Sequence, residues 1–214
     1  MKKKVYVVGY STGYAEFLSN YQLVDKLEDA NVVLFTGGED VTPEYYGCKK
    51  HPRTYNNTNR DRLEKSIYEK IRPDQFVLGI CRGSQFLCVM NGGILVQDCD
   101  NHAMWGTHEI TNGIDVYNIT STHHQMQFPY YLDKKDYDLL FWANRRCTRY
   151  EGDNIDPNLI IVNGEAEIVL YHKEGKPRCL AVQGHPEMMK NSPVAEMIDN
   201  LINENICYYE KENK

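Results

Sequence analysis

The sequence predicts an α/β protein in which helices cover both faces of a mostly parallel sheet. Three short apolar runs have the length of buried strands, and each leads into a turn that contains glycine: residues 4–9, 31–35 and 75–80. Segments with helical spacing or helical length alternate with these runs, at residues 21–29, 60–71 and 84–90. Strand, glycine turn and helix in alternation are typical of a parallel sheet.

Local signals support each helix of this first half. Residues 21–29 carry Leu23, Val24 and Leu27 at helical spacing. In the segment 60–71 apolar residues recur every four positions, and Pro73 stops the helix. Residues 84–90 end at two consecutive glycines, as a helix C-terminus does.

The second half is richer in predicted strands, which we expect at residues 93–97, 115–120, 159–162, 167–171 and 178–183. A closing helix is expected over residues 192–206, with Ser192 as its cap and Pro193 at its first position. Residues 129–158 have weak periodicity and many charges, and we interpret them as an elaborated surface segment. No linker or repeat interrupts the chain, which favours a single domain over residues 1–214.

Composition excludes several classes of protein. The formal net charge of −6 argues against a nucleic-acid-binding face, because phosphate binding needs surplus Lys and Arg. The apolar run at the N-terminus is too short for a signal peptide or a membrane span, so we expect a soluble, cytoplasmic protein without membrane contact. The seven cysteines include no Cys-x-x-Cys pair, which makes a disulfide framework improbable. Cys99 and His102 lack a second ligand pair at zinc-finger spacing, and we expect neither a metal nor a cofactor.

One cysteine stands in a different context. The run Gly79-Ile80-Cys81-Arg82-Gly83 joins a buried strand to a helix, in the Gly-x-nucleophile-x-Gly pattern of a sharp turn that lifts one side chain above the sheet. The helix N-terminus favours the thiolate form of Cys81, and the backbone N–H of Arg82 is free to bind an oxyanion. A structural cysteine in an incidental glycine turn is the alternative.

A thiol nucleophile needs a base and a group that orients the base. The strand at 178–183 runs into Gly184-His185-Pro186-Glu187, and the carboxylate of Glu187 can approach the ring of His185 and fix its tautomer. A second oxyanion donor is expected after the strand at 31–35, where Gly37 and Gly38 let the backbone approach a substrate carbonyl, with the N–H of Gly38 as donor. The alternative is a turn without chemical consequence.

These segments resemble the motifs of one superfamily. The run from Gly79 to Gln85 resembles the Gly-x-Cys-x-Gly-x-Gln motif of class I glutamine amidotransferases, and Gly184 to Glu187 resembles their His-x-Glu motif. The run from Thr36 to Gly47 is similar to the Gly-Gly-x-Asp-Val-x-Pro-x-x-Tyr-Gly signature of the γ-glutamyl hydrolase branch. Three further segments agree with that branch, namely 59–61, 92–98 and 121–125.

The resemblance implies a flavodoxin-like α/β/α sandwich with a Cys81–His185–Glu187 triad. It further implies hydrolysis of a small-molecule γ-glutamyl amide through a thioester on Cys81. By the same analogy, Gln85, His124 and Gly37 would hold the glutamyl head group. The sequence departs from the family at Thr36, where proline is common, and at Gly184, where tryptophan is common.

Three functions stay open at this stage. The first is a hydrolase that releases the amine, and the second is a glutaminase that supplies ammonia to a separate ATP-dependent ligase or synthase. The chain has no phosphate-binding Gly-x-x-x-x-Gly-Lys loop, so acceptor chemistry would belong to such a partner. The third is a catalytically silent binding protein, and a homodimer also stays open.

The other histidines receive a plainer interpretation. His123 and His124 are neighbours in an extended segment, so their side chains should point to opposite faces, which argues against a shared metal. We interpret the remaining histidines, other than His185, as surface or packing residues: His51, His102, His108 and His172.

Overall fold

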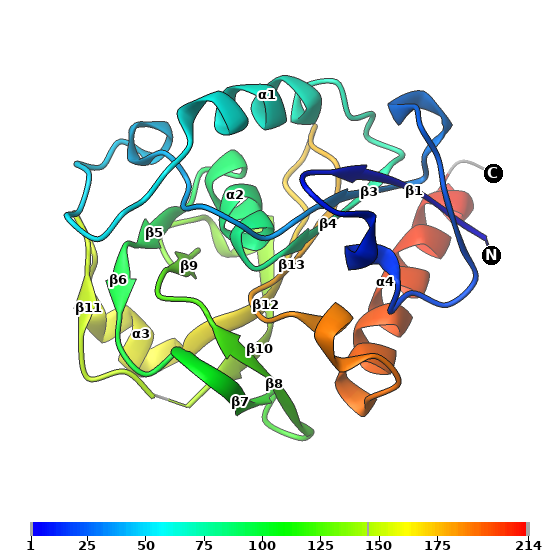
Figure 1. Ribbon diagram of the computed structural model, residues 1–214. Coiled ribbons are helices and arrows are strands. Elements are labelled where there is room, and N and C mark those ends of the chain that lie inside the picture. Colours follow the sequence, from blue (N-terminus) through cyan, green and yellow to red (C-terminus); the bar gives the residue numbers. More distant parts are fainter. Residues whose placement is uncertain (1, 145, 213–214) are drawn as a thin grey trace.

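The protein forms a nine-stranded sheet in the order β2-β1-β3-β4-β13-β12-β10-β7-β8 (Figure 1). The structure is a computed structural model, which describes residues 2–144 and 146–212, without the side chains of 207–212. The sheet strands are β1 (Lys3–Val8), β2 (Tyr21–Leu23), β3 (Val32–Phe35), β4 (Phe76–Ile80), β7 (Ala103–Thr111), β8 (Val116–Thr122), β10 (Tyr137–Ala143), β12 (Glu165–Tyr171) and β13 (Cys179–Val182). Two small two-stranded sheets pair β5 (Ile94–Val96) with β9 (Met126–Phe128), and β6 (Asp98–Cys99) with β11 (Tyr150–Glu151).

The first five strands in this order are all parallel, and the last four are joined by antiparallel pairing. The α-helices of the described chain are α1 (Thr58–Tyr68), α2 (Arg82–Met90), α3 (Pro157–Asn163) and α4 (Pro193–Glu212). None of the helices in the described ranges is long and apolar enough to cross a lipid bilayer. The α/β fold class that the sequence predicted is confirmed.

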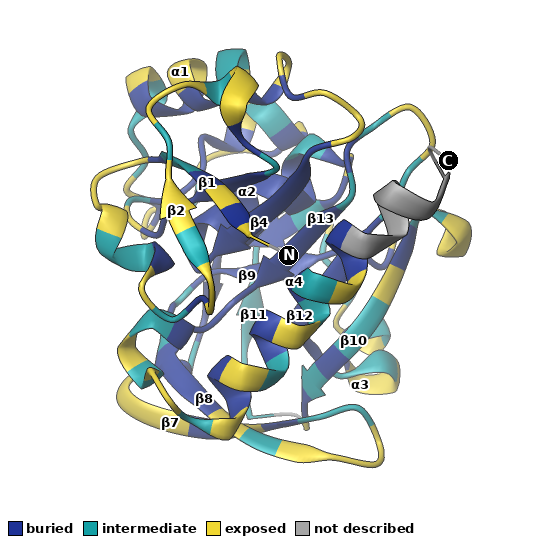
Figure 2. Ribbon diagram, turned by 90° about the vertical axis from the view of Figure 1, so that its right-hand side faces the viewer, coloured by how far each residue is buried: buried dark blue, intermediate teal, exposed yellow. Residues whose placement is uncertain are grey.

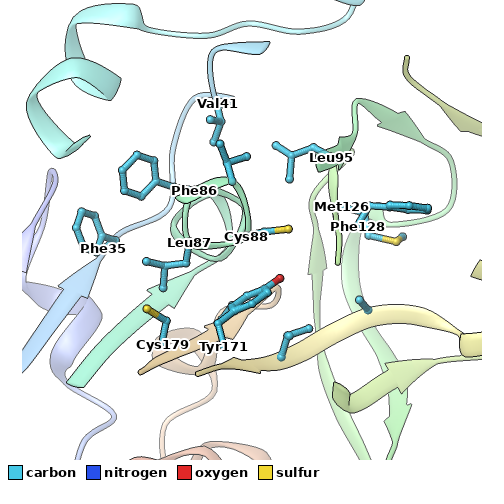
Figure 3. Close-up of a cluster of buried hydrophobic side chains, with 14 of the residues drawn as sticks. Phe35, Val41, Phe86, Leu87, Cys88, Leu95, Met126, Phe128, Tyr171 and Cys179 are labelled. Atoms are coloured by element: carbon cyan, nitrogen blue, oxygen red, sulfur yellow. The ribbon is translucent and has the colours of Figure 1, made fainter. Parts of the chain in front are cut away.

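Two hydrophobic cores lie on opposite faces of the central strands. Alternate residues of β3 point to opposite faces, so Val33 and Phe35 join one core while Val32 and Leu34 join the other. Helix α2 covers the first face with Phe86 and Leu87 (Figure 3). Helix α4 covers the second face with residues such as Ile198, and the strands between the helices are buried (Figure 2). The result is a three-layer arrangement.

Two predicted elements are wrong. Residues 21–29 do not form a helix, because Tyr21–Leu23 pairs with the edge strand β1 as β2 and only Leu27–Asp29 makes a 3₁₀ turn. Residues 159–162 are not a strand but part of α3. The cap at Asp156, whose side chain accepts from the N–H of Asn158, and Pro157 in the first turn start that helix.

The surface-segment interpretation of 129–158 is wrong for β10. This strand lies inside the sheet between β12 and β7, and it buries Tyr137, Phe141 and Ala143. Irregular pairing with β12 between Leu139 and Phe141 interrupts the two-residue alternation. That interruption explains why the periodicity of the sequence is weak there.

The predicted helix at 60–71 is confirmed as α1, but its apolar stripe is not its buried face. Leu63 is 61% exposed, whereas Arg60, Asp61 and Glu64 are buried. The closing helix is confirmed as α4, with the N–H of Ala195 donating to Ser192 Oγ. Six cysteines are buried and free, and the side chain of Cys207 lies outside the described residues.

Candidate active site

Cys81 lies in a strained turn between β4 and α2, as the glycine pattern predicted. Its backbone has φ 53° and ψ −111°, a conformation that side chains other than glycine rarely adopt. Both flanking glycines are required by close approach. A Cβ on Gly79 would lie 2.5 Å from the carbonyl oxygen of Gly83, and one on Gly83 would lie 2.2 Å from that of Phe35. The turn therefore holds the thiol at the carboxyl end of the central strand.

His185 reaches the same end of the sheet from β13. Strands β4 and β13 are parallel neighbours with Ile80 opposite Val182, so the segments that follow them lie side by side. The backbone N–H of His185 donates to Thr120 Oγ1 of β8 at 2.6 Å, which anchors the segment. Its ring Nδ1 lies 2.7 Å from Glu187 Oε1. The predicted His–Glu contact is present, although it is made through a 3₁₀ turn at Pro186–Met189 and not through extended chain.

The electrostatics of this pair favour a charged imidazole. Burial lowers the pKa of His185, but interactions of the ring with the Cys81 thiol and with the Glu187 carboxylate outweigh that effect and raise the pKa to about 10. The proton therefore resides on His185 at neutral pH.

The glycine pair after β3 lies against these groups. A Cβ on Gly37 would lie 3.1 Å from His185 Cε1 and 3.5 Å from Cys81 Cβ, so a side chain there would crowd the base. Gly38 has φ +139° and is exposed, and a Cβ there would lie 2.0 Å from Arg60 Nη1. The structure therefore brings Gly37 into direct contact range of the nucleophile and the base, with Gly38 one residue further out.

Arg60 holds this loop in place. Its Nη2 donates to the carbonyl oxygens of Gly37 at 2.9 Å and Thr36 at 3.1 Å, and its Nη1 pairs with Glu39 at 2.8 Å. Its Nε donates to Glu64 at 2.7 Å within α1. Sequence reasoning did not identify Arg60 as part of the site, although it lies in the Asn59-Arg60-Asp61 segment that resembles the family.

Arg82 and Gln85 both turn their side chains into the interior. The guanidinium of Arg82 pairs with Asp61 and Glu64, while its backbone N–H, at the first residue of α2, has no acceptor within the helix. The side-chain amide of Gln85 donates to the carbonyl oxygen of Gln125 at 3.0 Å. Arg82 thus offers only its backbone to a substrate, and the amide nitrogen of Gln85 is already used.

His124 lies between two carboxylates and is partly exposed. Its Nε2 lies 3.2 Å from Asp40 Oδ1, and its Nδ1 lies 3.2 Å from Asp98 Oδ1. The hydrogen bond to Asp40 raises the pKa of His124 against the opposing effect of burial. Asp40 is two residues beyond Gly38, so His124 is tied to the end of the glycine loop. As predicted, its neighbour His123 points elsewhere and is buried.

Tyr14 is a site residue that sequence reasoning missed. Its ring centroid lies 6.0 Å from that of His185, and a Cβ on Gly37 would lie 2.8 Å from its hydroxyl oxygen. Burial, with smaller contributions from Glu187 and Cys81, raises the pKa of Tyr14 to about 12. It comes from a 3₁₀ turn at Thr12–Ala15, for which the sequence offers no motif.

Comparisons with known proteins identify a family and several relatives. The family model described as Peptidase C26 matches residues 17–130. A provisionally named glutamine amidotransferase of Mycobacterium tuberculosis is 28% identical over 166 residues, which are 75% of this chain and 52% of the relative. The protein NtpR of Enterococcus hirae is 31% identical over 86 residues, which are 39% of this chain and 36% of NtpR. The chain spans between about a third and a half of the length of the curated relatives it matches.

Solved structures share the fold at low sequence identity. A provisionally named GMP synthase subunit from Thermoplasma acidophilum has a TM-score of 0.61 at 16% identity, covering 100% of this chain and 99% of that one. A glutamine amidotransferase from Thermotoga maritima has a TM-score of 0.50 at 15% identity, covering 99% and 98%. The match of the family model over more than half of the sequence, together with these folds, assigns the chain. The protein belongs to the Peptidase C26 family, within the class I glutamine amidotransferase-like superfamily.

Proposed function

We propose that the protein hydrolyses a γ-glutamyl amide with Cys81 as nucleophile, His185 as general acid and base, and Glu187 as the orienting carboxylate. One observation carries the proposal: a strained cysteine at a helix N-terminus lies beside a histidine whose other side is held by a carboxylate. A structural cysteine has no need of a strained backbone, whereas strain of this kind is concentrated at functional sites.

The steps follow from where the proton resides. The Cys81 sulfur attacks the γ-carbonyl carbon, and the carbonyl oxygen becomes an oxyanion that accepts hydrogen bonds from the N–H groups of Gly38 and Arg82. The intermediate collapses to a γ-glutamyl thioester as His185 gives its proton to the leaving amine. Water then attacks the thioester, His185 takes and keeps one proton of that water, and the C–S bond breaks to release glutamate and the Cys81 thiolate.

Binding of the glutamyl head group falls to the residues around this centre. Gly37 is beside the nucleophile, and its missing side chain leaves room for the Tyr14 hydroxyl and the His185 ring. His124 is assigned to the head group by the family resemblance, and its ring is held at the end of the glycine loop by Asp40 and Asp98. Gln85, which the resemblance also assigns to the head group, supports the wall through its hydrogen bond to the Gln125 carbonyl.

A second candidate is supply of ammonia to a separate synthase or ligase. The observation that favours it is the position of the glycine loop at the surface: Gly38 is exposed and the Glu39 side chain is 38% exposed. A partner that contacts Glu39 could reposition the N–H of Gly38 and so turn hydrolysis on.

Initial rates of the purified protein on glutamine and on several extended γ-glutamyl amides separate these functions. A stand-alone hydrolase should cleave an extended amide at about 1–10³ per second, whereas a partner-dependent glutaminase should be slow on every substrate alone. Brisk cleavage of an extended amide would rule out partner dependence, and feeble rates on all substrates would rule out the stand-alone enzyme.

The nucleophile is tested with a matched pair of variants. Cys81→Ala should abolish turnover while circular dichroism shows the fold intact, and Cys88→Ala, which changes a buried thiol of the same helix, should retain turnover. Burial raises the pKa of Cys88 to about 12, so iodoacetamide should label Cys81 in preference. Turnover by folded Cys81→Ala would remove this thiol from the mechanism.

A further inference from the structure

Three histidines and two glutamates that have no part in the proposed reaction meet in the interior. His102 precedes β7, His108 lies in β7 and His123 follows β8, while Glu165 and Glu167 lie in β12. All five are at most 3% exposed. The ring centroids of His102 and His123 lie 4.6 Å apart. So many ionisable groups without solvent require a physical reason, because an unpaired polar group in the interior is costly.

Hydrogen bonds fix which ring nitrogens carry protons. His123 Nδ1 lies 2.9 Å from the carbonyl oxygen of Gln125, which can only accept, so Nδ1 holds the proton and Nε2 has a free lone pair. His102 Nε2 lies 2.9 Å from Glu165 Oε2 and donates to it, and in that tautomer Nδ1 is the ring nitrogen with a lone pair.

The two lone pairs converge on a third acceptor. His102 Nδ1 lies 3.6 Å and His123 Nε2 lies 3.8 Å from Glu167 Oε1. Ligand atoms of these three residues all lie within 4.8 Å of one another. Within the described part of the chain, His102 Nδ1, His123 Nε2 and Glu167 Oε2 have no hydrogen-bond partner. Glu167 Oε1 is paired with His108 Nε2, and no donor lies between the Glu167 carboxylate and the two histidine lone pairs. A cation at that point removes the repulsion between these acceptors.

We infer that His102 Nδ1, His123 Nε2 and the Glu167 carboxylate bind one divalent transition-metal ion, with zinc as the best match. Zinc bonds of about 2.0–2.2 Å in tetrahedral geometry place ligand atoms about 3.4 Å apart, close to the spacings found here. Two imidazoles and a carboxylate suit zinc and disfavour magnesium and calcium, which prefer oxygen ligands.

Each ligand also has the outer partner that metal sites typically show. Glu165 accepts from His102, the Gln125 carbonyl accepts from His123, and His108 Nε2 lies 2.8 Å from Glu167 Oε1. Such partners orient the ligands and set the tautomers. A surface cavity of about 310 Å³ has His108 in its wall, so this histidine lies between the cavity and Glu167.

The position of the cluster indicates a structural role for the ion. Strand β7 of the β7–β8 hairpin pairs with β10 at one position, Trp142 with Thr111. His102 comes directly before the hairpin and His123 directly after it, at the open end where Ala103 pairs with Thr122. The ion would join both histidines directly to Glu167 of β12. It would therefore fasten the hairpin to the sheet beyond β10.

The test measures metal content and stability rather than turnover. Protein produced with zinc in the medium and then dialysed should contain one zinc per chain by elemental analysis, and His123→Ala and Glu167→Gln should lose it. His172→Ala, which changes a histidine paired with Asp138 outside the cluster, should keep the metal. Chelator-treated wild-type protein should unfold at a lower temperature, and added Zn²⁺ should restore the original midpoint.

Cobalt provides a readout that does not depend on any variant folding. Co²⁺ added to the chelator-treated wild-type protein should produce the visible absorption of a four-coordinate ion, and Zn²⁺ should displace it. Wild-type protein that contains no metal and shows neither a cobalt spectrum nor a thermal response to Zn²⁺ would overturn the inference, and the cluster would then be held by shared protons alone.

Discussion

Replacement of Arg82 by methionine removes a buried guanidinium and keeps the backbone N–H that we propose as an oxyanion donor. The side chains of Arg82, Asp61 and Glu64 are 1%, 1% and 2% exposed, so each carboxylate loses a desolvated partner. Removing one member of a buried ion pair costs about 3–5 kcal/mol. We expect a cost near the lower end of this range. Glu64 still pairs with Arg60, and Asp61 still accepts a hydrogen bond from the N–H of Thr42 at 2.8 Å.

Urea denaturation followed by circular dichroism measures this loss. A cost of about 3 kcal/mol is a large share of a total stability of about 5–15 kcal/mol, and it lowers the urea midpoint by about 1 M or more. Lys65→Met on the exposed face of α1 is the matched control, since its pair with Glu69 spans 4.0 Å at the surface and should contribute less than about 1 kcal/mol.

Neutralising both carboxylates tests the cause. The variant Arg82→Met/Asp61→Asn/Glu64→Gln should recover part of the lost stability, because no unpaired charge remains buried. The folded fraction of Arg82→Met should retain turnover. A loss below about 1 kcal/mol would refute the buried-charge reasoning, and inactive but folded protein would mean that the guanidinium itself takes part in the reaction.

Three further predictions concern the site. In NMR titrations His185 should stay protonated to about pH 10, so the stability from its charge is complete below pH 6.5 and is lost as pH rises through about 10. Glu187→Gln should lower that pKa, and a wild-type ring that titrates near 6.5 would contradict the assignment. Gly83→Ala should cost about 1–3 kcal/mol in thermal unfolding, since its Cβ meets the Phe35 carbonyl; an unchanged midpoint would show that the turn relaxes freely. Tyr14→Phe should reduce kcat about fivefold, because it removes the hydrogen bond between the Tyr14 hydroxyl and the backbone of Gly37, which is worth about 1 kcal/mol. An unchanged kcat would show that this hydroxyl has no part in turnover.

The nucleophile turn could be predicted from the sequence because its cause is local. Gly79 is required by contacts within one strand–turn–helix unit, with Gly83 and Leu87, whereas Gly83 is required by the backbone of Phe35 in the neighbouring strand. The pattern of five residues nevertheless contains both glycines. The pairing of His185 with Glu187 is also local. The buried face of α1 is decided by tertiary contacts. Arg60 is buried because its partner Glu39 comes from another loop, and the spacing of apolar residues along α1 does not reveal this ion pair.

The histidine cluster could not be predicted from the sequence. Its residues come from three strands or their ends, up to 65 positions apart, and only strand pairing brings them together. Strand β7 gave no signal because its first five residues are exposed and only His108 and Ile110 turn inward. The interpretation of His102 and His108 as packing residues described their burial and missed what they are buried against.

The hydrogen bond from His185 to Thr120 has a consequence for the order in which the molecule comes apart on heating. Thr120 belongs to the β7–β8 hairpin, the end of the sheet with the fewest paired positions to its neighbour. Amides of such a segment exchange with solvent by local opening, well before the central strands do. Each opening releases the backbone that positions His185, so activity should fade at temperatures where β3, β4 and β13 are still protected from exchange.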